Sequence, residues 1–266
     1  MTIPPEFQNA VYVTSLGMGR MIPIFLIAPF LGGSMLQQSV RNAIILSLIV
    51  FLYPLLETQV PTDGMPSTAG FMALMLKELS IGVLIGFLVS VPFWIANGAG
   101  FMIDNQRGAT MAQIMDPLSG ESSSPFGNLV FQTLTMIFIV SGGLAVFFGI
   151  VFESYRLWPP FSFVPDFSSA KLAALFNRQL DLMMLFVLLL SAPALIICFL
   201  TDFGMGLMNR FAPQLNVFFL AMPVKSGLAS ALLIAYWGVL FAMLKSQTLS
   251  QLGAIRYLSS AIGYVD

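Results

Sequence analysis

Four long stretches of this 266-residue sequence contain no charged residue. They run from Leu79 to Ile103, Phe126 to Phe152, Leu182 to Leu200 and Ser226 to Leu244. An α-helix rises about 1.5 Å per residue, so about 20 apolar residues cross the hydrocarbon core of a bilayer. Each stretch reaches or nearly reaches this length, which predicts four membrane-spanning helices.

The overall composition excludes most other classes of protein. Hydrophobic residues make up 58% and charged residues 9% of the chain, and the mean hydropathy is +0.89, which a water-soluble surface cannot match. The net charge of −1 without a basic patch argues against nucleic acid as a partner. Histidine is absent and Cys198, a small apolar filler in its run, is the single cysteine. These facts remove the usual zinc, haem and iron–sulfur ligand sets and His-dependent catalysis, so we expect no cofactor and no enzyme activity.

The N-terminal part predicts two further, weaker helices. The run from Val11 to Leu31 contains Arg20, and the run from Asn42 to Leu56 is short and lies between Arg41 and Glu57. We interpret the two as a hairpin that crosses the membrane incompletely. No basic region precedes the first run, so we expect it to be retained as part of the protein rather than cleaved as a signal peptide.

Prolines and glycines within the runs predict broken helices and close helix contacts. A proline frees a carbonyl and kinks or breaks a helix, which at membrane depth requires protein or water to satisfy the backbone. The prolines concerned are Pro23, Pro29, Pro54, Pro92, Pro193 and Pro223. Small residues at helix spacing favour close packing, and they occur at Gly82 with Gly86 and at Gly142, Gly143 and Gly149. The alternative is that glycine is simply frequent in membrane helices.

Two connectors differ in their predicted roles. Residues 153–178 begin with a charged pair beside Tyr155 and Trp158, which favours an aromatic anchor at the membrane interface. Residues 97–125, NGAGFMIDNQRGATMAQIMDPLSGESSSP, form the one long polar interruption of the apolar sequence. A turn between two helices needs only a few residues, so this second connector is expected to have a function of its own.

Charged residues inside or beside the apolar runs need partners. A charge at the bilayer centre costs about 3 kcal/mol on insertion scales. Asp104 and Arg107 are three residues apart and could pair on one helix face. For the group as a whole we expect internal ion pairs within an assembly or the lining of an aqueous path, whereas solvation at an interface is the interpretation for Lys245 and Arg256. The residues are Arg20, Lys77, Glu78, Asp104, Arg107, Asp202, Arg210 and Lys225.

Four segments, in order, resemble the FliR/SctT family, the T component of the type III secretion export apparatus. They are GMGRMIPIFLIAPFLGGSMLQQSVR, KELSIGVLIGF, GFMIDNQRGATMAQIMDPLSG and DFGMGLMNRFAPQLNVFFLAMPVKS. The segments QLNVFFLAMPVKS and SYRLWP look more like the injectisome SctT branch than the flagellar FliR branch. The resemblance covers nearly the whole chain.

The resemblance implies an all-α, polytopic hydrophobic protein of broken helices and hairpins. A single domain, 1–266, would contain an R-like (FliP-like) portion, residues 1–180, and an S-like (FliQ-like) hairpin, residues 181–266. With R and S subunits it would form a protein-conducting channel through the bacterial inner membrane for unfolded effector proteins, largely held above the membrane plane. U-type (FlhB-like) subunits, the V-type export protein and membrane lipid would be further partners.

The resemblance also gives roles to residues. Residues 108–125 would project into the pore and plug it, where deformable methionines and permissive glycines suit a gate for chains of any sequence. The plug residues would be Gly108, Met111, Met115, Asp116, Pro117 and Gly120. Buried charges and subunit contacts would be Arg20, Arg41, Lys77, Glu78, Asp104, Arg107, Asp202, Asn209, Arg210 and Lys225.

Two other functions are compatible with parts of the sequence. Broken helices and charges near the middle of apolar runs occur in secondary transporters of small solutes, but the sequence lacks the internal repeats typical of that class. An intramembrane aspartyl enzyme would have Asp104 and Asp202 as its only plausible pair, and TDFGMG lacks the expected glycine-then-aspartate order.

Overall fold

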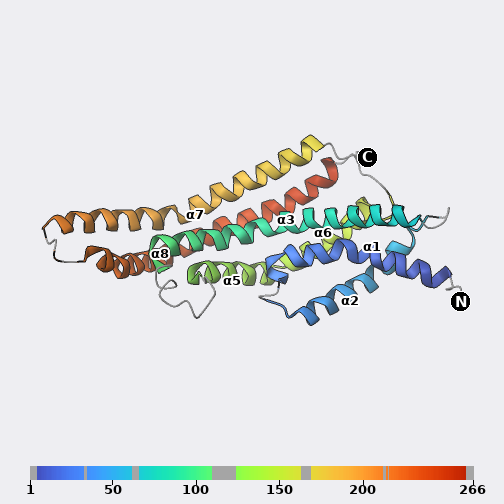
Figure 1. Cartoon of the computed structure of the whole chain (residues 1–266), viewed down its shortest axis with the longest axis horizontal. Helices are drawn as coiled ribbons and strands as arrows, with labels where there is room; N and C mark the ends of the chain where they lie inside the picture. Colours follow the sequence, from blue (N-terminus) through green and yellow to red (C-terminus); the bar gives the residue numbers. More distant parts are fainter. Residues whose placement is uncertain are drawn as a thin grey trace. The chain divides into compact units, whose positions relative to one another are not determined.

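The described residues form helices throughout, and no strand occurs among them (Figure 1). The computed structural model describes residues 5–32, 35–61, 66–109, 124–162, 169–211, 214 and 216–261. Its elements are α1 (Pro5–Ile27), the 3-10 helix η1 (Pro29–Leu31), α2 (Gln38–Glu57), α3 (Thr68–Gln106), α5 (Pro125–Val140), α6 (Gly143–Leu157), α7 (Ser169–Phe211) and α8 (Val217–Ala261). The predicted all-α class is confirmed.

Five of these helices are long and apolar enough to cross a membrane. They are α1, α2, α3, α7 and α8, and α5 with α6 passes the same test as one broken span. The polytopic character predicted from the uncharged runs is therefore confirmed.

The run from Phe126 to Phe152 was predicted to form one membrane-spanning helix, but it contains two, α5 and α6. It breaks at Ser141 and Gly142, between α5 and α6. Gly142 has φ +79°, a left-handed conformation that glycine adopts without steric cost. Within the described part of the chain, no atom lies within 4 Å of a Cβ built at Gly142 or Gly149. Gly142 thus makes a turn, in place of the close helix packing predicted there.

The prolines were predicted to kink or break the helices, and at five positions the α-helix continues through the proline without a break. These are Pro23, Pro54, Pro92, Pro193 and Pro223. A proline inside a membrane helix removes one backbone donor, which neighbouring groups can compensate. Kinks at these positions stay a prediction. Pro29 alone lies at a break, as the first residue of η1 just after α1 has ended.

The chain forms two compact units, and α3, α7 and α8 each contribute to both. The first contains Met1–Val91, Gly142–Leu175 and Leu249–Asp266, and the second contains Pro92–Ser141 and Phe176–Thr248. The change from one unit to the other along α3 thus falls at Pro92. The predicted division into R-like and S-like portions after residue 180 stays a prediction.

In the first unit, α1 packs closely against α3 at two glycines. A Cβ at Gly82 would collide with the carbonyl of Arg20, and one at Gly86 would lie 3.1 Å from the Cβ of Ile27. This approach of the two backbones brings Arg20 close to the α3 residues one turn before Gly82. The packing therefore positions the ion-pair cluster described below.

In the second unit, α3 and α5 meet at a pair of glycines. A Cβ at Gly100 would lie 2.5 Å from the Cα of Gly127. Beside this contact, the ring of Phe93 on α3 packs edge-on against Phe138 of α5, with centroids 5.4 Å apart. The small residues thus bring the start of α5 next to the end of α3.

Substituting Gly100 by alanine should destabilise the second unit. The new methyl group meets backbone rather than a movable side chain, so we expect a cost of about 1–3 kcal/mol from overpacking. The midpoint of thermal unfolding of the isolated chain in detergent measures it. Gly204→Ala is the matched control, since a Cβ there meets no described atom within 4 Å and alanine is the better helix former. Equal midpoints for the two variants would contradict the close approach of α3 and α5.

Candidate functional site: two buried charge clusters

The first unit contains a fully buried ion pair between α1 and α3. Arg20 and Glu78 are both 0% exposed. The Nε of Arg20 donates to Oε2 of Glu78 at 2.7 Å, and a terminal nitrogen donates to Oε1 at 3.0 Å. This two-bond geometry is the strongest form of an Arg–carboxylate contact.

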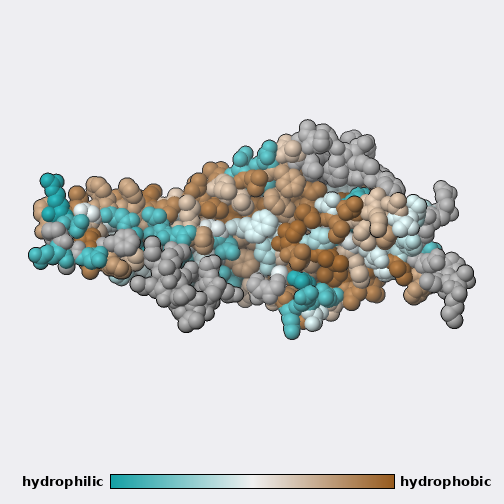
Figure 2. Space-filling model, in the orientation of Figure 1, coloured by the Kyte–Doolittle hydropathy of each residue, from teal (hydrophilic) through white to brown (hydrophobic). Residues whose placement is uncertain are grey.

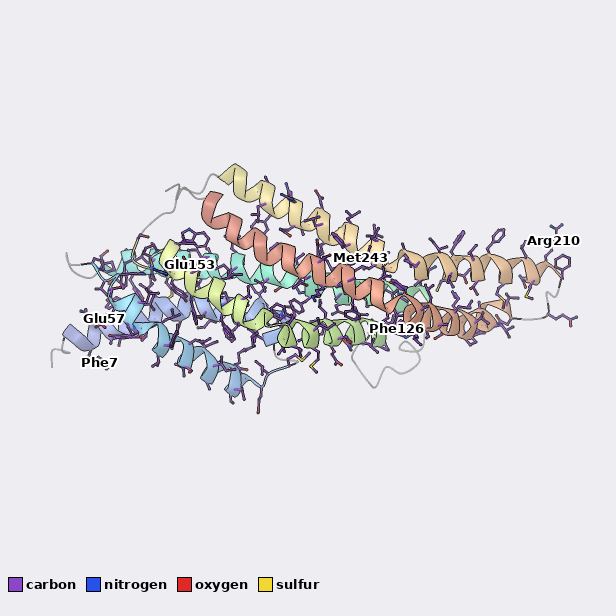
Figure 3. All side chains as sticks on the ribbon, turned by 180° about the vertical axis from the view of Figure 1, so that it is seen from behind. Phe7, Glu57, Phe126, Glu153, Arg210 and Met243 are labelled. Carbon is purple, nitrogen blue, oxygen red and sulfur yellow. The ribbon has the colours of Figure 1, made fainter. Side chains whose placement is uncertain are left out.

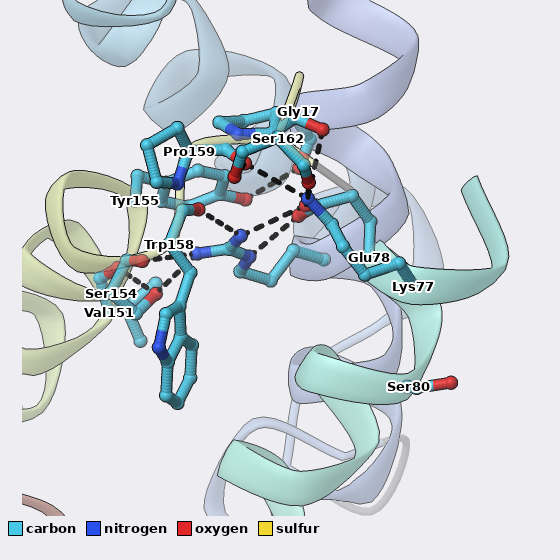
Figure 4. A network of polar contacts seen from close by, with 12 residues as sticks. Gly17, Lys77, Glu78, Ser80, Val151, Ser154, Tyr155, Trp158, Pro159 and Ser162 are labelled. Atoms are coloured by element: carbon cyan, nitrogen blue, oxygen red, sulfur yellow. Dashed lines mark hydrogen bonds and ion pairs between the residues drawn. The ribbon is translucent and has the colours of Figure 1, made fainter. Parts of the chain in front are cut away.

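The Arg20 guanidinium also binds the C-terminal end of α6, where Figure 4 labels Ser154 and Trp158. The remaining terminal nitrogen donates to the carbonyl of Ser154 at 2.6 Å and to its hydroxyl at 3.0 Å. The terminal nitrogen that binds Oε1 of Glu78 donates to the carbonyl of Trp158 as well, at 2.8 Å. The guanidinium carbon also lies 4.2 Å from the ring centroid of Tyr155. Every nitrogen of Arg20 therefore has an acceptor, which buried charge requires.

Lys77 binds the turn that follows α6. Its Nζ lies 2.9 Å from the carbonyl oxygens of Pro159 and Pro160, 2.8 Å from that of Ser162, and 2.9 Å from Oε1 of Glu78. Arg20 and Lys77 thus share the single negative charge of Glu78. Carbonyl oxygens at and just after the C-terminal end of α6, where the helix dipole is negative, compensate the remaining positive charge.

The predicted membrane-interface anchor at Tyr155 and Trp158 is wrong. Helix α6 extends to Leu157, so Tyr155 lies on its buried face with 0% exposure, and Trp158 follows with 8%. The hydroxyl of Tyr155 donates to the carbonyl of Gly17 on α1 at 2.6 Å. Both residues belong to the Arg20 cluster, which comprises Arg20, Lys77, Glu78, Ser154, Tyr155 and Trp158.

The second unit contains a cluster centred on Asp104, near the end of α3. Asp104 is 2% exposed. Its Oδ1 accepts from Nε of Arg107 at 2.7 Å, and its Oδ2 accepts from the hydroxyl of Ser124 at 2.5 Å and from the backbone N–H of Phe126 at 2.9 Å. Phe126 lies in the first turn of α5 (Figure 3), and the Arg107 guanidinium lies 4.0 Å from its ring centroid.

The Asp104 cluster joins the two ends of the segment predicted to be the plug. Arg107 and Gly108 are at its start, and Ser124 and Pro125 are at its end. Ser124 also caps α5 by accepting from the N–H of Gly127 at 2.9 Å. Gly108 has φ +86°, a conformation that suits glycine. The other predicted plug residues, Met111, Met115, Asp116, Pro117 and Gly120, lie outside the described residues.

A further ion pair joins α7 and α8. Nζ of Lys225 lies 2.9 Å from Oδ1 of Asp202, whose side chain is 42% exposed whereas that of Lys225 is 12% exposed. The neighbouring Ser226 accepts from Arg107 at 3.1 Å and so connects α8 with the Asp104 cluster.

Three of the predicted charge-cluster or subunit-contact residues lie apart from these clusters. Arg210 lies near the end of α7 (Figure 3), eight positions beyond Asp202, which binds Lys225. Asn209 and Arg210 are exposed, and Arg41 on α2 is partly buried. Their contacts with other subunits stay predictions.

The sequence pattern described as "Bacterial export proteins, family 1" matches residues 11–250. Over 230 residues the chain is 40% identical to the Yop proteins translocation protein T of Yersinia pestis, covering 86% of this chain and 87% of that protein. The chain belongs to this FliR/SctT family. It is also 32% identical to SpaR of Salmonella typhimurium over 232 residues, 87% and 85% of the two chains, and 26% identical to FliR of Bacillus subtilis over 194 residues, 73% and 74%.

Membership confirms the resemblance found in the sequence and the preference for the injectisome branch. FliR/SctT proteins are components of the type III secretion export apparatus in the bacterial inner membrane, and they are not enzymes. The five apolar helices fit a multi-pass protein of that membrane. The two buried clusters are accordingly parts of an export component.

Sequence reasoning missed several residues that complete the clusters. They are Ser124, Phe126, Ser154 and Ser226, together with Tyr155 and Trp158 in their buried roles. Ser124 followed by Pro125 was a usable signal, since serine at the N-cap and proline at the first position typify a helix start. The others act through long-range contacts, for which the local sequence has no signal.

Proposed function

We propose that this chain is the T-type subunit of a type III secretion export gate. With R-type (FliP-like) and S-type (FliQ-like) subunits it forms a channel that conducts unfolded effector proteins through the bacterial inner membrane. U-type (FlhB-like) subunits and the V-type export protein bind the same apparatus, and membrane lipid is a further partner.

The observation that carries this proposal is the length of the apolar helices. Helix α3 has 39 residues, α7 has 43 and α8 has 45, so each is about 58 Å or longer, whereas the hydrocarbon core is about 30 Å thick. Exposed apolar side chains extend along α7 from Leu180 to Phe211. A bilayer covers only about half of such a helix, so partner subunits are needed to cover the remainder.

The surface of the described helices agrees with this requirement. Figure 2 shows hydrophobic residues over much of the visible face, interrupted by small hydrophilic groups. Only 22% of the apolar window of α7, and the same share of α8, is buried within the chain. Exposed apolar areas this extensive mark interaction surfaces, which supports placement of the chain inside a larger complex.

The Asp104 cluster supports the plug role of residues 108–125. It joins the residues at the two ends of this segment, Arg107 on one side and Ser124 and Phe126 on the other, at one buried carboxylate. In this role Met111 and Met115 adapt to different side chains, while Gly108 and Gly120 permit movement. Weak, deformable contacts hold back ions at rest and still pass a chain of any sequence.

Deleting Met111–Ser119 should make the resting gate leak. Cells that express the complete apparatus with this deletion are expected to lose membrane potential and admit small dyes, while the variant still co-purifies with R and S subunits. Met111→Leu with Met115→Leu is the matched control, since it keeps the bulk of both side chains and should keep the seal. An intact seal after the deletion would remove the plug role and leave family membership unchanged.

Co-purification tests the subunit role itself. The tagged chain extracted in mild detergent is expected to bring R-type and S-type subunits with it in one complex. Isolation instead as a monodisperse single chain that moves a small solute in proteoliposomes would favour a secondary transporter.

A further inference from the structure

Hydrogen bonds and two ion pairs of the second unit form a series across four helices, in which two adjacent residues of α8 make the last step. It begins at Ser124 and Phe126 of α5, passes through Asp104 and Arg107 at the end of α3, and reaches Ser226 on α8. The residue before Ser226 is Lys225, which binds Asp202 on α7. Within this series of described residues, Arg107 is the member that contacts both α8 and the Asp104 carboxylate.

Arg107 is suited to this position by its shape. Its guanidinium directs Nε and one terminal nitrogen to Oδ1 of Asp104, both at 2.7 Å, and the other terminal nitrogen to the Ser226 hydroxyl at 3.1 Å. Its face lies on the ring of Phe126. A rigid planar fork can make these contacts together, whereas the single ammonium of a lysine cannot.

Arg107 binds both Asp104 and Ser226, so the loss of one contact changes the constraints on the other. Asp104 is 2% exposed and uses both oxygens, so Arg107 cannot turn away without leaving a buried carboxylate short of its cation. The Ser226 contact in turn limits where the guanidinium can lie. The position of α8 and the contacts that join the two ends of residues 108–125 therefore both depend on the Arg107 side chain.

We propose that Arg107 is a positioning residue that couples the α7–α8 hairpin to the Asp104 cluster. A partner subunit that holds α7 and α8 in place then also stabilises the Asp104 contacts that join the two ends of residues 108–125. This inference rests on the proposed function, because that function gives the segment its role. It concerns described residues alone and adds a coupling between two parts of the second unit.

The chain contains its own probe for this coupling. Cys198, its single cysteine, is 0% exposed on α7 and lies one turn before Asp202, which binds Lys225 on α8. Alkylation by N-ethylmaleimide therefore reports loosening on the hairpin side of the cluster. The reaction is measured in the purified complete complex, by mass spectrometry of the peptide that carries Cys198.

The decisive variants change Asp104 or Ser226, and the measured quantity is the alkylation rate of Cys198 on α7. Asp104→Asn changes the Asp104 cluster and leaves every residue of α7 and α8 unchanged. We expect it to raise the Cys198 alkylation rate by about fivefold or more. Ser226→Ala should raise it as well, and the double variant should react no faster than the faster single one, since both act through Arg107. Ser230→Ala is the control, because its hydroxyl contacts only the carbonyl of Ser226 in its own helix, and its rate should stay unchanged.

Two results would overturn the coupling. One is an Asp104→Asn rate equal to wild type, and the other is a double variant whose effects multiply. If Asp104→Asn fails to assemble, Ser124→Ala replaces it, since this change removes one hydrogen bond to Asp104 and keeps the charges; a wild-type rate for it would equally overturn the proposal. The alkylation rates test the coupling whether or not the Met111–Ser119 deletion leaks, so failure of the plug role is seen separately.

Discussion

Arg20→Met is expected to destabilise the chain more than Gly100→Ala or the loss of any exposed ion pair. It leaves the 0%-exposed Glu78 without its two-bond partner and frees the carbonyls of Ser154 and Trp158. Breaking a buried ion pair by removing one member costs about 3–5 kcal/mol, which is a large part of the stability of a typical domain. The thermal midpoint in detergent and the amount of the chain in the membrane measure the loss.

Two further variants separate the ion pair from its surroundings. Arg20→Met with Glu78→Leu removes both charges, and replacing a buried pair by apolar residues is often nearly neutral, so the double variant should recover much of the loss. Arg156→Ala removes a cation from the exposed pair with Glu153, where the atoms are 3.8 Å apart and the side chains 68% and 55% exposed; we expect an effect of less than about 1 kcal/mol. Equal losses in Arg20→Met and Arg156→Ala would contradict the role of the Arg20 cluster.

Asp104→Ala should be the second most damaging substitution. It removes the acceptor of Arg107, of the Ser124 hydroxyl and of the Phe126 N–H at once. Removing one member of a buried pair costs about 3–5 kcal/mol, and the Arg107 guanidinium, 12% exposed, can recover part of this from water. The two ends of residues 108–125 are also no longer joined. We expect both a lower thermal midpoint and loss of effector secretion, measured by the amount of effector in the culture medium.

Asp202→Ala is the matched control for this result. Its carboxylate also binds a cation, Lys225, but it is 42% exposed and lacks the hydroxyl and backbone N–H contacts of Asp104. Fewer donors lose their acceptor, so the midpoint of the isolated chain should change much less. Asp104→Asn should lie between wild type and Asp104→Ala, because an amide oxygen can still accept from the Phe126 N–H. An Asp104→Ala chain as stable as Asp202→Ala would show that the cluster does not hold the segment ends.

The candidate site was only partly predictable from sequence, and the separation of its residues explains the difference. Asp104 and Arg107 are three positions apart on one helix, so their pairing follows from helix geometry. Arg20 and Glu78 are 58 positions apart, and Arg20 and Ser154 are 134 positions apart. The sequence marked Arg20 and Glu78 as charges in need of partners but did not indicate that they bind one another.

The helix boundaries show the same limit. The apolar run from Phe126 to Phe152 predicted one helix because every residue in it is compatible with a membrane span, whereas the left-handed conformation of Gly142 divides it into two. The prolines were predicted to kink or break the helices, and five α-helices continue through them without a break, since a helix can tolerate one missing donor.

Hydropathy and charge placement alone therefore determined that this protein is an all-α membrane component, since a chain with 9% charged residues cannot build a water-facing surface, and the order of its segments determined the family. Which charges meet, where Tyr155 lies and how Ser124 and Phe126 join Asp104 were decided only by the tertiary structure. The physical reason is that a buried charge must have a partner, but packing at glycines such as Gly82 and Gly127 selects which partner comes within reach.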